Sequence, residues 1–137
     1  MLLYKQRRIN MEAKEILLNK QNFAVIGVTT NQEKYGYKIY QRLKKLNKNV
    51  YGVSPIYNEL NGETIYPNLS SIDNQIDVAV FVVNPKIALT YIEKCKKLKI
   101  KHIWLQPGTY DDNLIKIIKE SKLNYYLNCV LVESENM

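Results

Sequence analysis

The sequence has few of the residues from which disulfide frameworks and metal sites are built. It holds two cysteines and one histidine among 137 residues, and Cys95, His102 and Cys129 lack the spacing of metal ligands. No apolar run approaches the roughly 20 residues of a membrane span, and no secretory signal is visible near the N-terminus. We therefore expect a cytoplasmic protein with reduced thiols, no metal and no membrane partner.

Arginine is also scarce, although the chain is basic. Lys and Arg total 20 against 13 Asp and Glu, a net charge of +7, and the only arginines are Arg7, Arg8 and Arg42. Nucleic-acid sites favour Arg because its planar fork matches phosphates and base edges. The lysines are instead scattered over expected helices, which favours a solvated surface. We expect no nucleic-acid partner, whereas a small anionic ligand fits the charge.

Short apolar runs recur at regular spacing along the chain. They are Phe23–Val28, Val50–Val53, Val78–Val83, His102–Leu105 and Tyr125–Leu127. Most are continuous rather than alternating, as in strands that are covered on both faces of a parallel sheet. Segments of helical period lie between them. The pattern predicts an α/β, Rossmann-like, doubly wound fold whose five-stranded, mainly parallel sheet has helices on both faces.

The second crossover, residues 54–76, differs from the others because Gly62 and Pro67 interrupt it. We expect a loop, a short edge segment and one helical turn around Leu69–Ile72 there. Residues 1–22 are expected to form an N-terminal arm and a helix that starts at Met11. Residues 23–137 are expected to form one Rossmann-like domain.

Candidate ligand-binding residues follow the strands, since ligands of open α/β sheets bind beyond the carboxyl ends of the strands. The segment after the first strand begins at Gly27 and ends at Gly36. Between them stand Thr29, Thr30 and Lys34. Two hydroxyls, a helix N-terminus and a lysine together suit a phosphate or pyrophosphate. A glycine at a strand end is equally compatible with an ordinary tight turn.

The second expected strand is followed by Ser54 and Pro55, and the nearest acidic residue is Glu59. Folds that bind a nicotinamide dinucleotide place Asp or Glu here, where it holds the ribose hydroxyl. The missing carboxylate counts against an NAD-dependent dehydrogenase.

The remaining strand ends carry further candidates, each with a structural alternative. Asn84 and Pro85 follow the third strand and also suit a helix cap. Gln106 and Gly108 follow the fourth, where Pro-Gly is first of all a turn. Cys129 follows the fifth and is either buried filler or a thiol that faces the cleft.

The ordered set of motifs resembles that of the small bacterial CoA-binding proteins, which are stand-alone Rossmann domains related to the N-terminal domain of the succinyl-CoA ligase alpha subunit. The motifs here are GVTTNQEKYGYKIYQRL, VYGVSP, LNGETIYPNLSSI, DVAVFVVNP, KHIWLQPG and YYLNCVLVE, within Phe23–Glu133. The family's Lys-x-Gly corresponds to Lys34 and Gly36, and its Trp-x-Gln-x-Gly to Trp104–Gly108. The chain departs from the family at Ser54, where asparagine is usual, and at Val130, where proline is usual.

The resemblance implies a protein that binds coenzyme A or an acyl-CoA. The pyrophosphate would lie on Gly27–Gly36, the adenosine near Ser54, and the pantetheine arm across Asn84 and Gln106–Gly108. Catalysis is not indicated, because no Ser–His–acid set accompanies the single histidine. Two alternatives stay open: an NAD(P)-binding oxidoreductase-like domain, and a protein-interaction module with a vestigial nucleotide site. A protein partner or a homo-oligomer also stays open.

Overall fold

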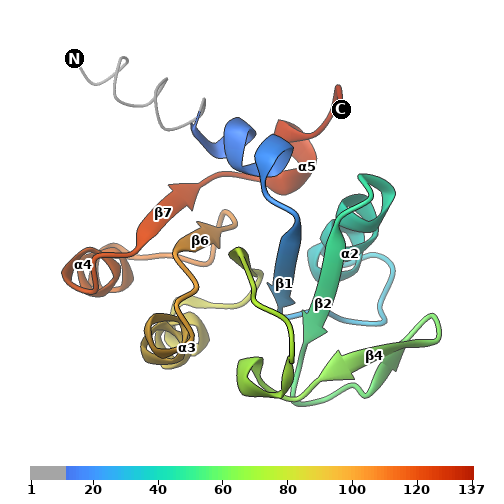
Figure 1. The fold of residues 1–137 in the computed structure, drawn as a ribbon, viewed down its shortest axis with the longest axis horizontal. Helices are drawn as coiled ribbons and strands as arrows, with labels where there is room; N and C mark the ends of the chain where they lie inside the picture. The colour runs from blue at the N-terminus through green and yellow to red at the C-terminus, as the bar shows by residue number, and fades with distance from the viewer. Residues whose placement is uncertain (1–11) are drawn as a thin grey trace.

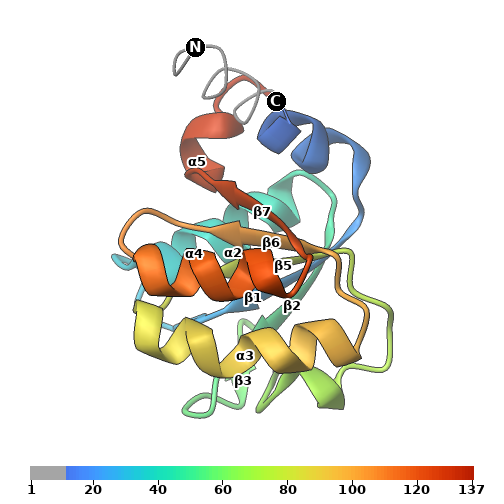
Figure 2. The same ribbon diagram turned by 90° about the vertical axis from the view of Figure 1, so that its left-hand side faces the viewer.

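The computed structural model describes residues 12–137, so the arm expected at residues 1–10 and the helix start expected at Met11 lie outside the described residues. One sheet of seven strands crosses the molecule, and helices cover both of its faces (Figures 1 and 2). The strands are β1 Asn22–Ile26, β2 Asn49–Val53, β3 Glu59–Leu60, β4 Glu63–Tyr66, β5 Val78–Phe81, β6 His102–Leu105 and β7 Asn124–Leu127. Residues 12–19 are helical, followed by α2 Tyr35–Lys45, the short 3₁₀ helix η1 Leu69–Ser71, α3 Pro85–Lys97, α4 Asp112–Glu120 and α5 Val130–Glu133.

The strand order confirms the Rossmann-like prediction. The order is β3-β4-β2-β1-β5-β6-β7, and only the β3–β4 pair is antiparallel. Without β3, the parallel strands follow the 3-2-1-4-5-6 order of the doubly wound dinucleotide-binding fold. Strands β2, β4 and β3 lie on one side of β1, and β5, β6 and β7 lie on the other, so the strand order reverses between β1 and β5. This switch point is where such folds bind their ligands.

The expected strand count of five is wrong, because the second crossover holds two further strands. Glu59 pairs with Thr64 and Leu60 with Glu63, so β3 and β4 form a hairpin with a two-residue loop. The loop residues Asn61 and Gly62 both have positive φ, 52° and 83°. This is the combination that a type I′ hairpin turn requires. The helical turn expected after it is present as η1.

The two faces of the sheet carry separate apolar cores. Phe23 and Val25 of β1 face the core under residues 12–19, α2 and α5, whereas Ala24 and Ile26 face the core under α3 and α4. Figure 2 shows α3 and α4 together on one face of the sheet. Burial on both faces explains why the strands read as continuous apolar runs. Of the helices in residues 12–137, none is long and apolar enough to cross a membrane.

The helix at residues 12–19 belongs to the first of these cores. Ala13 and Leu17 are fully buried there, in the same cluster as Phe23. Figure 1 shows this helix beside α5, next to the sheet. Residues 12–19 therefore pack on the domain and do not extend away from it.

Two glycines allow α2 to start against the end of β1. A Cβ on Gly36 would collide with the carbonyl oxygen of Gly27. Gly27 itself has a φ of 98°, and a Cβ there would collide with the backbone of Val82. Close helix–strand packing of this kind is one role of the glycines in dinucleotide-binding turns. The first turn of α2 is thereby fixed at the switch point.

Gly36→Ala is expected to lower the free energy of unfolding by about 1–3 kcal/mol, the cost of overpacking a tight contact. The direction of the change in unfolding free energy is informative, because intrinsic helix propensity alone favours alanine over glycine by about 1 kcal/mol. Urea denaturation measures the change. Gly62→Ala is the control, since a Cβ there meets open space and adds only the cost of its positive φ. A Gly36→Ala variant as stable as the parent would contradict a tight contact between Gly36 and Gly27.

Candidate functional site

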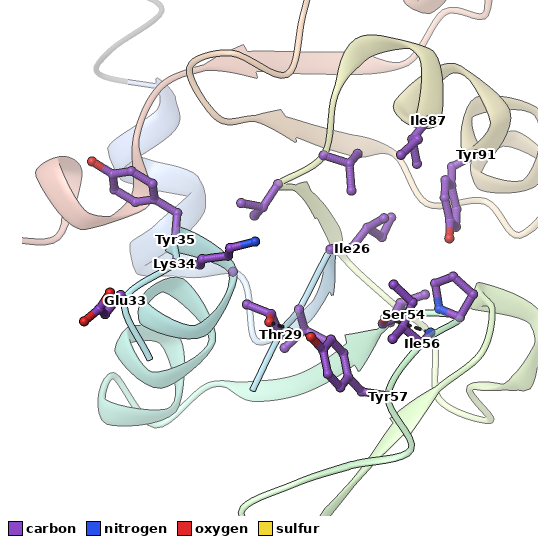
Figure 3. A pocket seen from close by; sticks show the side chains of 17 residues that line it. Ile26, Thr29, Glu33, Lys34, Tyr35, Ser54, Ile56, Tyr57, Ile87 and Tyr91 are labelled. Carbon is purple, nitrogen blue, oxygen red and sulfur yellow. Dashed lines mark hydrogen bonds between the residues drawn. The ribbon is translucent and has the colours of Figure 1, made fainter. Parts of the chain in front are cut away.

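A pocket of about 640 Å³ opens at the carboxyl ends of β1, β2 and β5 (Figure 3). Its position is the switch point of the sheet, and its volume lies within the roughly 300–1,000 Å³ of small-molecule sites. It has a polar end at the start of α2 and an apolar end between the β2–β3 loop and α3.

The structure brings one group of the predicted site residues into this pocket and leaves the others outside its lining. The lining includes Gly27, Thr29, Lys34, Gly36, Ser54 and Pro55. It does not include Thr30, Asn84, Pro85, Gln106, Gly108 or Cys129. Of the predicted segments, the first loop and the end of β2 therefore contribute to this pocket, and the ends of β6 and β7 do not.

The start of α2 forms the polar end of the pocket. Lys34 is the N-cap residue of α2, and its side chain makes no capping hydrogen bond. The N–H groups of Tyr37 and Lys38 are bonded to the Lys34 carbonyl, whereas the first two residues of a helix have no acceptor in a preceding turn. Figure 3 shows the Lys34 side chain extending into the pocket and Glu33 turned outward. Helix N–H groups, the helix dipole and an ammonium group thus converge at one place, where an anion is favoured.

The first loop is held by hydrogen bonds of Thr29. Its Oγ1 accepts the N–H of Asn31 at 3.1 Å and donates to the Tyr57 hydroxyl at 3.3 Å. Tyr57 belongs to the loop that follows β2, so the bond joins the two loops that enclose the pocket. Thr29 thereby fixes the shape of the polar end.

The end of β2 is held in a similar way. The N–H of Ser54 donates to the Tyr66 carbonyl at 2.9 Å, and its Oγ accepts the N–H of Ile56 at 3.1 Å. Ser54 is only 5% exposed, whereas Ile56 is 77% exposed at the pocket wall. No carboxylate of the described residues lines this end, where nicotinamide dinucleotide folds hold a ribose with Asp or Glu.

The opposite wall is apolar, and the sequence reasoning missed it. It consists of Val82 and Val83 after β5 and of Ile87 and Tyr91 on α3. Burial raises the pKa of the Tyr91 hydroxyl. The available signal was the i, i+4 spacing of Ile87 and Tyr91, one position before the core residues of α3. Attention to polar residues at strand ends could not find it.

Asn84 and Pro85 serve as the start of α3. The Oδ1 of Asn84 accepts the N–H of Ile87 at 2.9 Å, and Pro85 is the first helical residue. The capping interpretation is therefore confirmed. Through this cap the two residues position Ile87 in the pocket wall without lining it themselves.

Gln106 directly follows β6, and its side chain holds neighbouring segments together. It is 4% exposed, and its Oε1 accepts the N–H of Val130 at 2.8 Å and that of the Trp104 indole at 3.2 Å. The bond to Val130 satisfies the start of α5, next to the half-buried Cys129. Gly108, with a φ of 89°, forms the turn expected of it. Gln106 therefore ties the end of β6 to the start of α5.

His102 lies at the amino end of β6, at the opposite edge of the sheet from the pocket. Its Nδ1 and the Tyr126 hydroxyl are 2.9 Å apart. Burial, followed by the positive charge of Lys20, lowers the pKa of His102. A base at this position cannot serve the pocket. Residues 12–137 also contain no group of three or more His, Cys, Asp or Glu side chains that could hold a metal ion.

Solved structures share this architecture. A hypothetical protein from Pyrococcus horikoshii OT3 superposes with a TM-score of 0.86 at 29% identity, over 92% of this chain and 89% of that one. The dinucleotide-forming acetyl-coenzyme A synthetase 1 of Ca. Korarchaeum cryptofilum superposes with a TM-score of 0.71 at 25% identity, over 81% of this chain and 26% of the synthetase.

Sequence comparison gives the family. An ADP-forming acetate–CoA ligase of Methanocaldococcus jannaschii is 32% identical over 81 residues, which are 59% of this chain but only 12% of the ligase. The chain thus corresponds to a small part of that enzyme. The family profile described as CoA binding domain matches residues 21–135. The resemblance to CoA-binding domains is confirmed, and the chain belongs to the CoA binding domain family.

Proposed function

We propose that the chain binds coenzyme A or an acyl-CoA in the pocket at the switch point. The observation that carries the proposal is the convergence of the N-terminus of α2 and the Lys34 side chain on that pocket. An anionic diphosphate matches these groups in charge and in hydrogen bonding. Membership of the CoA binding domain family supports CoA as the ligand that carries it.

The remaining parts of the ligand follow from the position of the diphosphate. The adenosine extends toward Ser54 and the apolar wall of Ile56, Ile87 and Tyr91, which suits a flat base. The pantetheine arm leaves on the other side, past Asn84 and Pro85 after β5, toward Gln106–Gly108 after β6 and Cys129 after β7. This pose combines the polar end of the pocket with a hydrophobic slot for the base.

The proposed role is binding rather than catalysis. The described lining has one acidic residue, Glu33, and neither histidine nor cysteine, so it offers no nucleophile–base pair of the usual kind. The relatives that carry a ligase activity are far longer than the part this chain matches. We infer a carrier, a sensor or the CoA-binding part of a larger acyl-CoA enzyme.

Removal of the Lys34 charge tests the polar end. Lys34→Ala is expected to weaken CoA binding by about 1.5–3 kcal/mol, the range of a charge-assisted hydrogen bond, and to leave stability unchanged. Isothermal titration calorimetry measures the affinity. Lys38→Ala is the matched control, because Lys38 is on the same helix but outside this lining. Equal affinities of the two variants would remove Lys34 from the site.

The choice between CoA and NAD tests the pantetheine arm. The two ligands share the adenosine diphosphate, and no carboxylate of the described residues lines the end of β2 to hold the NAD ribose. CoA should therefore bind at least about tenfold tighter, or about 1.4 kcal/mol, through the pantetheine arm that NAD lacks. The net charge of +7 also favours the more anionic ligand, but that part fades as salt rises. Titrations at low and physiological salt separate the two contributions. NAD that binds as tightly as CoA in both would favour the oxidoreductase-like alternative.

The path of the pantetheine arm is tested by the two thiols. Cys129 is half-buried, whereas Cys95 is fully buried on α3 and burial raises its pKa to about 12. CoA disulfide should label Cys129 first: the Cys129 thiolate attacks one disulfide sulfur, and a CoA thiolate leaves. Peptide mapping by mass spectrometry reads the site.

Labelling of Cys129 that follows CoA binding must be distinguished from labelling of a thiol that is simply exposed. Labelling of Cys129 by CoA disulfide should saturate with concentration and slow in Lys34→Ala, whereas labelling by cystamine should do neither. Equal labelling of both cysteines, or identical behaviour of the two reagents, would contradict the proposed path.

A further inference from the structure

We propose that the pocket does not recognise the 3′-phosphate of coenzyme A, and so binds CoA and dephospho-CoA with equal affinity. This inference rests on the proposed function, since it takes the adenosine diphosphate as the part that is bound. The ligand class is then any pantetheine-bearing adenosine diphosphate, whether or not its ribose is phosphorylated.

The ribose position follows from the fold. When a diphosphate lies on the helix that follows the first strand, the adenosine ribose reaches the end of the second strand, where dinucleotide-binding folds hold it. In this chain that place is the segment Ser54–Tyr57, which leads from β2 into the hairpin. A phosphate on the ribose 3′ oxygen would therefore be recognised by side chains of this segment or of α3 opposite.

The segment at the end of β2 contains no cation. Its residues are Ser54, Pro55, Ile56 and Tyr57. Its hydroxyls are acceptors in bonds within the protein, Ser54 Oγ from the N–H of Ile56 and the Tyr57 hydroxyl from Thr29. They can offer a phosphate a neutral O–H donor but no positive charge. A phosphate dianion that lost water here would gain no opposite charge, so it is more stable in solvent.

The wall on the α3 side is no more suitable for a phosphate. Val82, Val83, Ile87 and Tyr91 form it. Among residues 12–137, Lys34 is the only basic residue of the lining, and it faces the diphosphate at the other end of the pocket. Lys86 precedes Ile87 on α3, but it is not part of the lining.

Two isoleucines instead offer an exposed apolar surface at this end. Ile56 is 77% exposed and Ile87 is 45% exposed, and they stand on opposite walls of the pocket (Figure 3). Exposed side chains of this size at a pocket mouth bury their apolar area when a flat base enters between them. The end of β2 is thus suited to the base of the nucleotide and not to an additional charge.

The experiment compares CoA with dephospho-CoA by calorimetry at low and at physiological salt. At physiological salt the two dissociation constants should agree within about threefold, well short of the at least tenfold effect of a charge-assisted contact. At low salt the net charge of +7 should give CoA an advantage that disappears on adding salt. A preference for CoA of tenfold or more at physiological salt would overturn the proposal, with Lys86 the first residue to test.

A gain of recognition tests the ribose position itself. Ile56→Lys places an ammonium group at the end of β2 and should make CoA bind at least about tenfold tighter than dephospho-CoA. Ile56→Leu is the control that keeps the apolar wall and should keep the two ligands equal. An Ile56→Lys variant without preference would overturn the proposal, because the ribose would then lie elsewhere. If neither ligand binds the parent protein, the proposed function itself fails, which is a different result.

Discussion

The site depends on one close contact, the approach of the first turn of α2 to the carboxyl end of β1. Gly36 and Gly27 permit it because a Cβ on either would collide with backbone atoms. The contact fixes where the N–H groups of α2 point and where Lys34 begins. The same turn lies at the switch point of the sheet, so a packing requirement of the fold also sets the geometry of the proposed anion site.

The pocket combines two kinds of surface that come from different parts of the chain. The polar end is local in sequence, since a single loop and one helix start provide it. The apolar end needs the β2–β3 segment and α3 to come together across the sheet, and it presents the exposed side chains of Ile56 and Ile87. A ligand with a charged diphosphate and a flat base is complementary to both ends.

Sequence reasoning succeeded where the signal was local and periodic. Continuous apolar runs predicted the parallel strands, and Asn84-Pro85 predicted the start of α3. The β3–β4 hairpin was missed although Asn61-Gly62 is a strong turn signal, because its strands are only two and four residues long. The role of the Gln106 side chain as an acceptor could not be predicted from its position at a strand end. Its partners Trp104 and Val130 come together only in the folded protein. The apolar wall was missed for another reason: candidates were sought among polar residues at strand ends, whereas Ile87 and Tyr91 are apolar or aromatic residues on α3.

A crystal structure of the protein with bound CoA would show directly whether the start of α2 holds the diphosphate. The diphosphate is expected within hydrogen-bond distance of the N–H groups of Tyr35 and Gly36 and of Lys34 Nζ, with the adenine between Ile56 and Ile87. CoA bound with its diphosphate away from the start of α2, or at another surface of the molecule, would contradict this arrangement.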